Sequence, residues 1–190
     1  MNDYQRLVAI LAERSARRGQ FTLSSGRVST LYIDARMTTM SPEGLVLIGR
    51  LGLAEIAAAG WTPDAVGGLT LGADPISYAI SYASSETSAP VRAFTVRKAT
   101  KTHGTGKLIE GPFNPSDRVV VTEDVITTGG SALKAIEALR DAGATIMGVL
   151  ALVDREEGGR EAIEREGLSV RVLASAQAIV AHMDRYPGNL

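Results

Sequence analysis

Short, wholly apolar segments alternate with helix-like segments along most of this 190-residue chain, and this alternation constrains the fold more than any other feature. A strand that is apolar throughout has both faces buried, which is typical of a parallel sheet covered by helices. Strands that alternate with helices are the pattern of α/β proteins. The sequence therefore predicts an α/β fold, with a doubly wound, mainly parallel sheet and helices on both faces.

The expected elements follow one another regularly after residue 40. Ser41 is a good N-cap and Pro42 suits the first helical position, so a helix is expected from there to about Ala59. Further strands are expected at residues 65–69, 91–96, 119–122, 145–153 and 170–173, and further helices at 74–83, 131–142 and 157–166. No linker divides the chain, so we expect a single domain of residues 1–190 with its α/β core at 41–190.

Residues 1–40 do not follow this alternation. Apolar residues between positions 7 and 11 recur at helical spacing, and Gly19 is expected to end that helix. Two short strand-like pieces, at 21–23 and 30–34, are separated by a turn signal. We interpret residues 1–40 as a small hood over one end of the sheet.

Charge and cysteine content exclude several classes of protein. The chain has 20 Lys and Arg against 21 Asp and Glu, a net charge of -1, whereas a surface that binds nucleic acid or anionic lipid needs an excess of cations. With 0 Cys there is no disulfide framework and no cysteine nucleophile. No signal peptide or membrane-spanning segment is evident. We expect a cytoplasmic protein with no membrane or nucleic-acid partner.

One long segment between two expected strands has no apolar periodicity. Residues 97–111 are rich in Thr and Gly and carry their cations before the first acid, Glu110. Loops this long tend to be lids or binding loops, so we expect a flexible active-site loop. The alternative is a solvated or nucleic-acid-binding surface, which the lack of interleaved aromatic residues disfavours. The cations are Arg97, Lys98, Lys101, His103 and Lys107.

The most informative motif follows the strand expected at 119–122. Two carboxylates, Glu123 and Asp124, precede a Thr-Thr-Gly-Gly-Ser turn at residues 127–131 that begins a helix. The turn offers hydroxyls, approachable backbone N–H groups and a positive helix end, which suit a phosphate. The carboxylates suit the vicinal hydroxyls of a ribose, and Mg²⁺ would find oxygen there as well. Each fragment alone also fits an ordinary strand end or helix entry, but their succession is more specific.

Two competing phosphate-binding motifs are absent from the sequence. There is no G-x-x-x-x-G-K-[ST] segment, so the P-loop interpretation fails. The only glycines two positions apart, Gly104 and Gly106, are followed by Ile109 where a dinucleotide-binding motif needs Gly or Ala.

The stretch from Val119 to Ser131 resembles the phosphoribosyl pyrophosphate (PRPP) signature of type I phosphoribosyltransferases. The segment RKATKTHG at residues 97–104 resembles the loop of the orotate phosphoribosyltransferases in particular. Residues 21–26 and 154–155 match the same family near its start and its end. The resemblance covers most of the chain. It implies transfer of the phosphoribosyl group of PRPP to N1 of orotate, which yields orotidine 5'-monophosphate and pyrophosphate in de novo pyrimidine (UMP) biosynthesis.

The resemblance also implies roles for single residues. The implied PRPP-binding residues are Arg97, Lys98, Lys101, His103, Glu123, Asp124, Val125, Ile126, Thr127, Thr128, Gly129, Gly130 and Ser131, with Gly72 and Ala73 in an earlier turn. The implied catalytic residues are Asp124, Lys98 and Lys101. The lysines oppose the charge of the leaving pyrophosphate, and Asp124 either stabilises the sugar or handles a proton.

The chain departs from the family pattern at two places. Ser24 stands where many members have a lysine that reaches PRPP. The turn around Gly72 lacks a lysine that some members have nearby. Lys98 and Lys101 must then do more of the charge neutralisation.

The base-binding residues implied by the resemblance are Thr127 and Arg155. Arg155 follows a long expected strand, and its guanidinium can grip the carboxylate of orotate through two parallel bonds. The alternative is an ion pair with Glu156 or Glu157. The resemblance further implies Mg²⁺ without a dedicated protein metal site, and a homodimer in which each loop closes over the neighbouring active site. Two rival functions remain, namely a purine or uracil phosphoribosyltransferase and a non-enzymatic PRPP sensor that binds nucleic acid.

Overall fold

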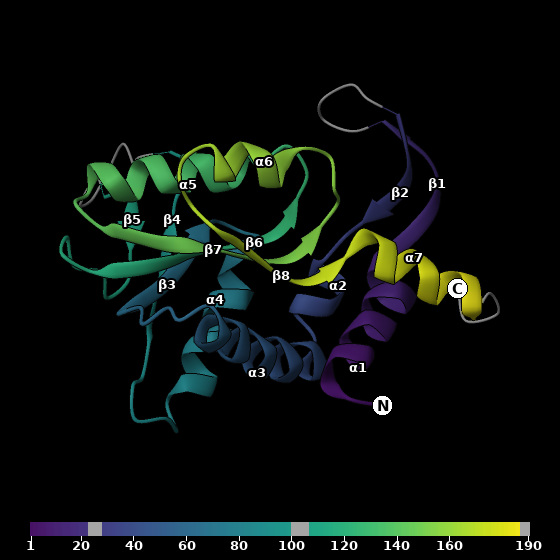
Figure 1. Ribbon diagram of the computed structural model, residues 1–190, viewed down its shortest axis with the longest axis horizontal. Coiled ribbons are helices and arrows are strands. Elements are labelled where there is room, and N and C mark those ends of the chain that lie inside the picture. Colours follow the sequence, from purple (N-terminus) through teal and green to yellow (C-terminus); the bar gives the residue numbers. More distant parts are fainter. Residues whose placement is uncertain (23–27, 100–106, 187–190) are drawn as a thin grey trace.

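The computed structural model describes residues 1–22, 28–99 and 107–186, and a six-stranded sheet lies at its centre (Figure 1). The strands, in the spatial order β5-β4-β3-β6-β7-β8, are β3 (Ala65–Leu69), β4 (Arg92–Val96), β5 (Ile109–Glu110), β6 (Arg118–Ile126), β7 (Thr145–Asp154) and β8 (Val170–Ser175). All neighbours pair in parallel except β4 and β5, which are antiparallel. The predicted doubly wound, mainly parallel sheet is confirmed.

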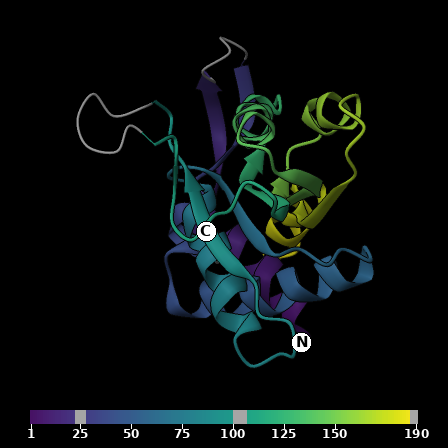
Figure 2. The ribbon, with the colours of Figure 1, turned by 90° about the vertical axis from the view of Figure 1, so that its left-hand side faces the viewer.

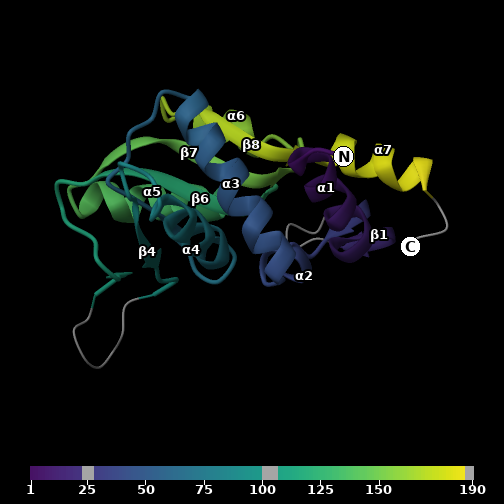
Figure 3. The ribbon, with the colours of Figure 1, turned by 90° about the horizontal axis from the view of Figure 1, so that it is seen from below.

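Helices cover both faces of this sheet. They are α3 (Pro42–Ala58) and α4 (Ala73–Ser84) on one face, and α5 (Gly130–Asp141) and α6 (Gly159–Glu164) on the other (Figures 1 and 3). Successive residues of β6 face opposite layers, as the pleat requires: Val120 belongs to the core under α3 and α4, whereas Val119 and Val121 belong to the core under α5. Burial on both faces is why the strands are apolar throughout.

The N-terminal residues form a separate group of elements beside the sheet. They are α1 (Asp3–Ile10), a π-helical turn η1 (Leu11–Ser15), the antiparallel strands β1 (Ala16–Thr22) and β2 (Val28–Ile33), and α2 (Arg36–Thr39). The two strands extend toward the side of the sheet that α5 and α6 cover (Figures 1 and 2). The C-terminal helix α7 (Ala176–Arg185) packs against α1 and η1, so the first and last helices lie side by side.

Several expected boundaries are wrong. Gly19 does not end the first helix, because the helical segment stops at Ser15 and Gly19 lies within β1. A Cβ on Gly19 would come within 3.0 Å of the Phe21 ring, so glycine serves a close approach there and not a helix end. The last core helix is shorter than expected, and the segment expected as a loop at 97–111 contains the edge strand β5. No helix in the described part of the chain is long and apolar enough to cross a bilayer.

Candidate active site

Three connections leave the carboxyl edge of the sheet from adjacent strands. They are the turn at residues 70–72 after β3, the turn at 127–129 after β6, and the segment at 155–158 after β7. Ligands of open α/β sheets bind in the crevice at this edge. The sequence motifs at 72–73, 123–131 and 155 are therefore brought to one edge of the fold.

Asp124 lies against the first of these turns. A Cβ on Gly72 would lie 2.4 Å from the carboxylate carbon of Asp124, so only glycine allows the turn to approach this closely. The same carboxylate accepts a hydrogen bond of 2.8 Å from the backbone N–H of Val125. The peptide bond between Thr70 and Leu71 in this turn is cis. Asp124 is not placed after the strand, as the sequence analysis expects, but inside β6, which runs on to Ile126.

Buried polar groups hold this turn, and they are not among the predicted site residues. Asp74, in the first turn of α4, accepts hydrogen bonds from the hydroxyls of Thr70 at 2.7 Å and Thr95 at 2.9 Å. Ser77 and Thr122 share a hydroxyl hydrogen bond of 2.7 Å between α4 and β6. These bonds connect β4, β6 and the turn after β3 to one helix. The only signal in the sequence is an acid at the start of a helix, which is common.

Glu123 is a buried carboxyl with an unused acceptor. Its side chain is on β6, opposite Ala151 of β7, and the residue is only 5% exposed. Burial raises the pKa of Glu123 well above its usual range, and the neighbouring Asp124 carboxylate adds to the shift. Its Oε2 atom has no hydrogen-bond partner in the described structure. Because an unpaired buried acceptor is costly, this oxygen is available to a hydroxyl of a ligand.

The turn after β6 exposes backbone donors at the start of α5. Gly129 has a φ of 81°, in the left-handed region, and a Cβ there would meet the carbonyl of Gly159 at 2.8 Å. No side chain caps this helix end, so its N–H groups remain open to an anion. Ile126 is buried in the core under α5, so it can contact a ligand only through its backbone. Thr128 and Ser131 are exposed, and Thr127 is half-buried.

Arg155 is placed at the edge but already has partners. Its backbone N–H donates to the carbonyl of Ile126 at 3.0 Å, which ties it to the end of β6. Its Nη2 donates to Ser29 Oγ of β2 at 2.6 Å and forms an ion pair with Glu157 at 2.8 Å. The alternative interpretation of Arg155 as the partner of Glu157 is therefore present in the structure. Ser29 was not predicted, because nothing in a local sequence pattern connects residues so far apart.

The cationic loop is described only in part. Arg97 follows β4, is half-buried, and its guanidinium lies 3.5 Å from Glu110; its Nε atom is buried with no hydrogen-bond partner among the described residues. Lys98 is exposed. Ser24, Lys101 and His103 lie outside the described residues.

A further cation reaches this site from the N-terminal elements. Arg36 pairs with Asp34 through two bonds, Nε to Oδ1 at 2.8 Å and Nη2 to Oδ2 at 2.9 Å. The hydrogen bond from Arg36 lowers the pKa of Asp34 below its usual value. The hydrogen bond to Asp34 raises the pKa of the Arg36 guanidinium, and the charge of Asp124 adds a smaller contribution. The sequence analysis did not identify Arg36.

Comparison with known proteins identifies the family. Residues 41–182 match the model of the phosphoribosyl transferase domain. Over 171 residues the chain is 49% identical to the orotate phosphoribosyltransferase of Aquifex aeolicus, covering 88% of this chain and 92% of that relative. The chain belongs to the orotate phosphoribosyltransferase family. The resemblance seen in the sequence motifs is thus confirmed.

Solved structures of this family share the fold. A crystal structure of Mycobacterium tuberculosis H37Rv orotate phosphoribosyltransferase in complex with PRPP is 40% identical and has a TM-score of 0.80, covering 94% of this chain and 99% of that one. The same enzyme in complex with Fe(III) dicitrate is 42% identical with a TM-score of 0.81 and the same coverage.

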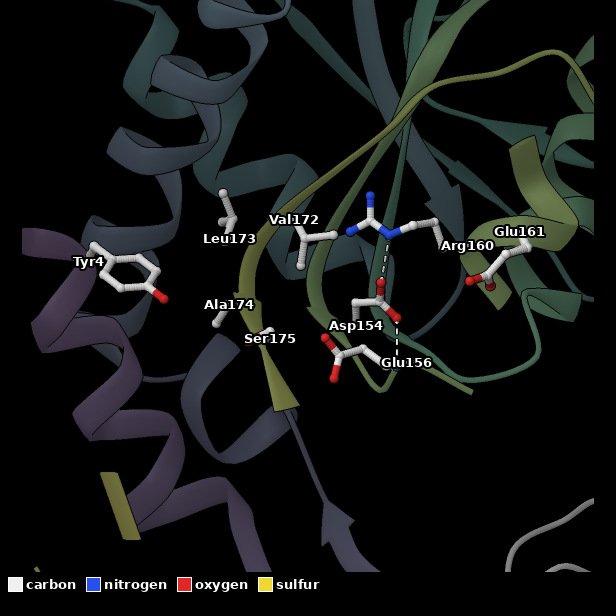
Figure 4. A pocket seen from close by; sticks show the side chains of 9 residues that line it. All are labelled: Tyr4, Asp154, Glu156, Arg160, Glu161, Val172, Leu173, Ala174 and Ser175. Carbon is white, nitrogen blue, oxygen red and sulfur yellow. Dashed lines mark hydrogen bonds and ion pairs between the residues drawn. The ribbon is translucent and has the colours of Figure 1, made fainter. Parts of the chain in front are cut away.

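A pocket of about 400 Å³ in this phosphoribosyltransferase lies at the ends of β7 and β8, with Tyr4 of α1 on its opposite side (Figure 4). Within it, Asp154 accepts a hydrogen bond from Arg160 Nε at 2.9 Å and another from the backbone N–H of Glu156 at 2.8 Å. These contacts hold the start and end of the segment at 155–158.

The described residues contain no group of three or more His, Asp or Glu side chains that could hold a metal ion by themselves. Glu123 and Asp124 nevertheless supply oxygen atoms, one of them buried and unpartnered. Mg²⁺ is usually held by one or two carboxylates together with substrate oxygens and water. The donor set of this orotate phosphoribosyltransferase fits that mode of binding.

Proposed function

We propose that this protein transfers the phosphoribosyl group of PRPP to N1 of orotate, giving orotidine 5'-monophosphate and pyrophosphate in UMP biosynthesis. The observation that carries the proposal is the contact of Asp124 with the Gly72 turn, beside an uncapped helix end and one strand away from Arg155. A sugar, its phosphates and a carboxylate-bearing base each find suitable groups within this edge. Family membership supports the same reaction.

In the proposed mechanism the bond from the sugar C1 to pyrophosphate breaks, the bond from C1 to N1 of orotate forms, and the N1 proton passes to Asp124 or to the departing pyrophosphate. Glu123 and Asp124 accept hydrogen bonds from the ribose hydroxyls, and Asp124 supplies negative charge beside the positive sugar. The backbone at residues 125–131 binds a phosphate, and that of Gly72 and Ala73 binds pyrophosphate. Positioning and electrostatics thus carry the catalysis.

The cations of the loop complete the proposed site. Arg97, Lys98, Lys101 and His103 oppose the charge that develops on pyrophosphate. Mg²⁺ belongs to the proposal as well: when bound, it neutralises phosphate charge, and Asp124 and Glu123 are the residues that would hold it. In the orotate subsite, Arg155 binds the carboxylate and Thr127 contacts the base.

A homodimer with the loop at 97–111 contributed in trans is also proposed. Large apolar side chains are exposed on α4 and on α2, as expected where a second copy packs. They are Leu71, Tyr78 and Tyr82 at α4, and Met37 and Met40 at α2. We further propose that residues 1–190 act as one catalytic domain with residues 1–40 as its hood. The proposed location is the cytoplasm, because charged phosphate substrates do not cross a bilayer unaided.

A spectrophotometric assay of orotate consumption with PRPP and Mg²⁺ tests the function. We expect orotate to be consumed, and adenine, hypoxanthine and uracil to give no comparable turnover. Turnover of one of these other bases in place of orotate would favour the rival phosphoribosyltransferase. PRPP binding without any turnover would favour the regulator, which the net charge of -1 disfavours.

A further inference from the structure

The guanidinium of Arg155 is almost fully enclosed and has two different partners on one nitrogen. Its side chain is 6% exposed, and that of Glu157 is 19% exposed. Nη2 lies 2.6 Å from Ser29 Oγ and 2.8 Å from Glu157 Oε1. The contact with Ser29 is a hydrogen bond, and the contact with Glu157 is an ion pair that places a carboxylate oxygen beside the same nitrogen.

This arrangement limits how a carboxylate can bind Arg155. A guanidinium binds a carboxylate with two parallel bonds either through Nε and Nη2 or through Nη1 and Nη2. Both modes use Nη2. A substrate carboxylate that binds with both oxygens therefore meets the negative charge of Glu157 at the same nitrogen, so Glu157 must move aside.

Ser29 is the partner that remains bound to Arg155 when a substrate carboxylate arrives. Its hydroxyl donates to the carbonyl of Leu31 at 2.9 Å, and the same oxygen accepts from the backbone N–H of Leu31 at 3.2 Å. The oxygen is thus fixed within β2 as an acceptor for Arg155. Glu157 lies between β7 and α6 on a longer side chain with several rotatable bonds. Exchange of one carboxylate for another also keeps a counter-ion on a buried guanidinium throughout.

We propose that Glu157 is an internal competitor of the substrate carboxylate. Glu157 neutralises the charge of Arg155 while the site is empty and moves away when the substrate carboxylate binds. Ser29 is a positioning residue that holds the guanidinium in place. This inference rests on the proposed role of Arg155 in binding orotate. Glu157 then weakens the binding of each ligand that presents this carboxylate, the product included. Ser29 couples β2, in the N-terminal elements, to the base subsite.

Two matched variants test the competitor. Glu157→Gln keeps the shape of the side chain and removes its charge, whereas Glu156→Gln makes the same change on the exposed neighbouring residue. We expect Glu157→Gln to lower the KM for orotate and the Kd for orotidine 5'-monophosphate by about threefold to tenfold, with the KM for PRPP unchanged. Glu156→Gln should change none of these values. An orotate KM that is unchanged or raised in Glu157→Gln overturns the proposal.

Ser29 is tested by rescue. Ser29→Ala should raise the KM for orotate with little change in kcat, and Ser29→Thr, which keeps the hydroxyl, should restore it. Thr30→Ala, on the same strand with an exposed side chain, is the matched control and should behave like the unmodified protein. Equal effects of Ser29→Ala and Thr30→Ala would mean that only strand structure was disturbed, which overturns the positioning role.

The variant Arg155→Ala separates this inference from the function it rests on. If the unmodified protein does not consume orotate, the proposed function is refuted. The proposed exchange of Glu157 for the substrate carboxylate is then refuted as well. If orotate is consumed and Arg155→Ala raises its KM, the proposed function holds. The exchange is then tested with the double variant Arg155→Ala, Glu157→Gln. Glu157→Gln should not change the KM for orotate once Arg155 is absent. An equal effect of Glu157→Gln in both backgrounds overturns the exchange alone.

Discussion

At the scale of the single residue, the buried carboxyl of Glu123 connects the active site to the stability of the protein. Burial raises the pKa of Glu123 well above its usual range, whereas in the unfolded chain the group titrates at its ordinary value. Between these two pKa values the folded protein binds more protons than the unfolded chain. The free energy of unfolding is therefore highest below the unfolded pKa and falls as the pH rises through the folded one.

Glu123→Gln removes this titration and should stabilise the protein at high pH. We expect its Tm to exceed that of the unmodified protein at pH 8 by about 2–4 °C, the shift that roughly 1 kcal/mol produces in a chain of this length. The difference should shrink as the pH is lowered toward about 4, near the ordinary pKa of a glutamate side chain. Thermal unfolding at several pH values measures it. A Tm difference independent of pH would refute the role of the buried charge.

Arg155→Ala should weaken the use of orotate far more than the binding of PRPP. The substitution removes the partner of the orotate carboxylate and leaves the phosphate-binding turn in place. Loss of a charged hydrogen-bonded pair costs roughly 1.5–3 kcal/mol, so kcat/KM for orotate should fall about tenfold to a hundredfold. Initial rates at varied orotate and varied PRPP provide both constants. A kcat/KM for orotate that stays within about twofold would show that Arg155 does not read the base.

Sequence patterns predicted the charged residues of the site better than their surroundings. Glu123, Asp124 and Arg155 could be named because a strand followed by polar residues is visible locally. Ser29 and Asp74 could not, because their importance arises from hydrogen bonds across elements that only the fold brings together.

At the scale of elements, the close contact between the β3–α4 turn and β6 requires that residue 72 has no side chain, and this requirement can be tested. Gly72→Ala places a Cβ 2.4 Å from the Asp124 carboxylate, so the carboxylate or the turn must move. Such overpacking costs about 1–3 kcal/mol, and we expect kcat/KM for PRPP to fall roughly tenfold to a hundredfold.

Gly60→Ala is the contrasting control, because a Cβ there meets nothing within 4 Å although the φ of 69° is strained for alanine. Its Tm should fall with kinetics unchanged. If Gly72→Ala and Gly60→Ala have the same kcat/KM for PRPP, the close approach of the Gly72 turn to Asp124 is not required for activity.

A helix or strand boundary could be predicted where a single local feature, such as a helix-capping side chain, determines it. The helix that begins after Ser41 was correctly predicted, because the Ser41 side chain caps the N–H of Gly44 at 3.1 Å. The end of the first helix was not, since Gly19 serves the packing of an aromatic ring. The edge strand β5 has only two residues, Ile109–Glu110, and pairs with β4 by tertiary contact, without apolar periodicity of its own.

At the scale of the whole molecule, a loop contributed in trans predicts complementation between two inactive variants. Lys101→Ala damages the loop, and Asp124→Asn damages the home site. Each homodimer should be nearly inactive, because transition-state charges are lost. After dissociation and reassociation, about half of the dimers are mixed, and each has one intact site, so up to roughly a quarter of the unmodified activity should return.

The control for this experiment is confirmed subunit exchange, measured with differently tagged copies. A loop that acts within its own subunit would leave every site defective. Activity no higher than the mean of the two separate variants, with exchange confirmed, would then exclude the loop in trans.

Because α1 packs against α7, the buried face of α1 is completed only after residues 176–185 have left the ribosome. The buried side chains of α1, such as Leu7 and Ile10, lack part of their cover while the sheet strands emerge behind them. Strand β2, which holds Ser29 against Arg155, is attached to this unfinished layer. We therefore expect β2 to reach its final position beside Arg155 only after the strands of the central sheet have formed.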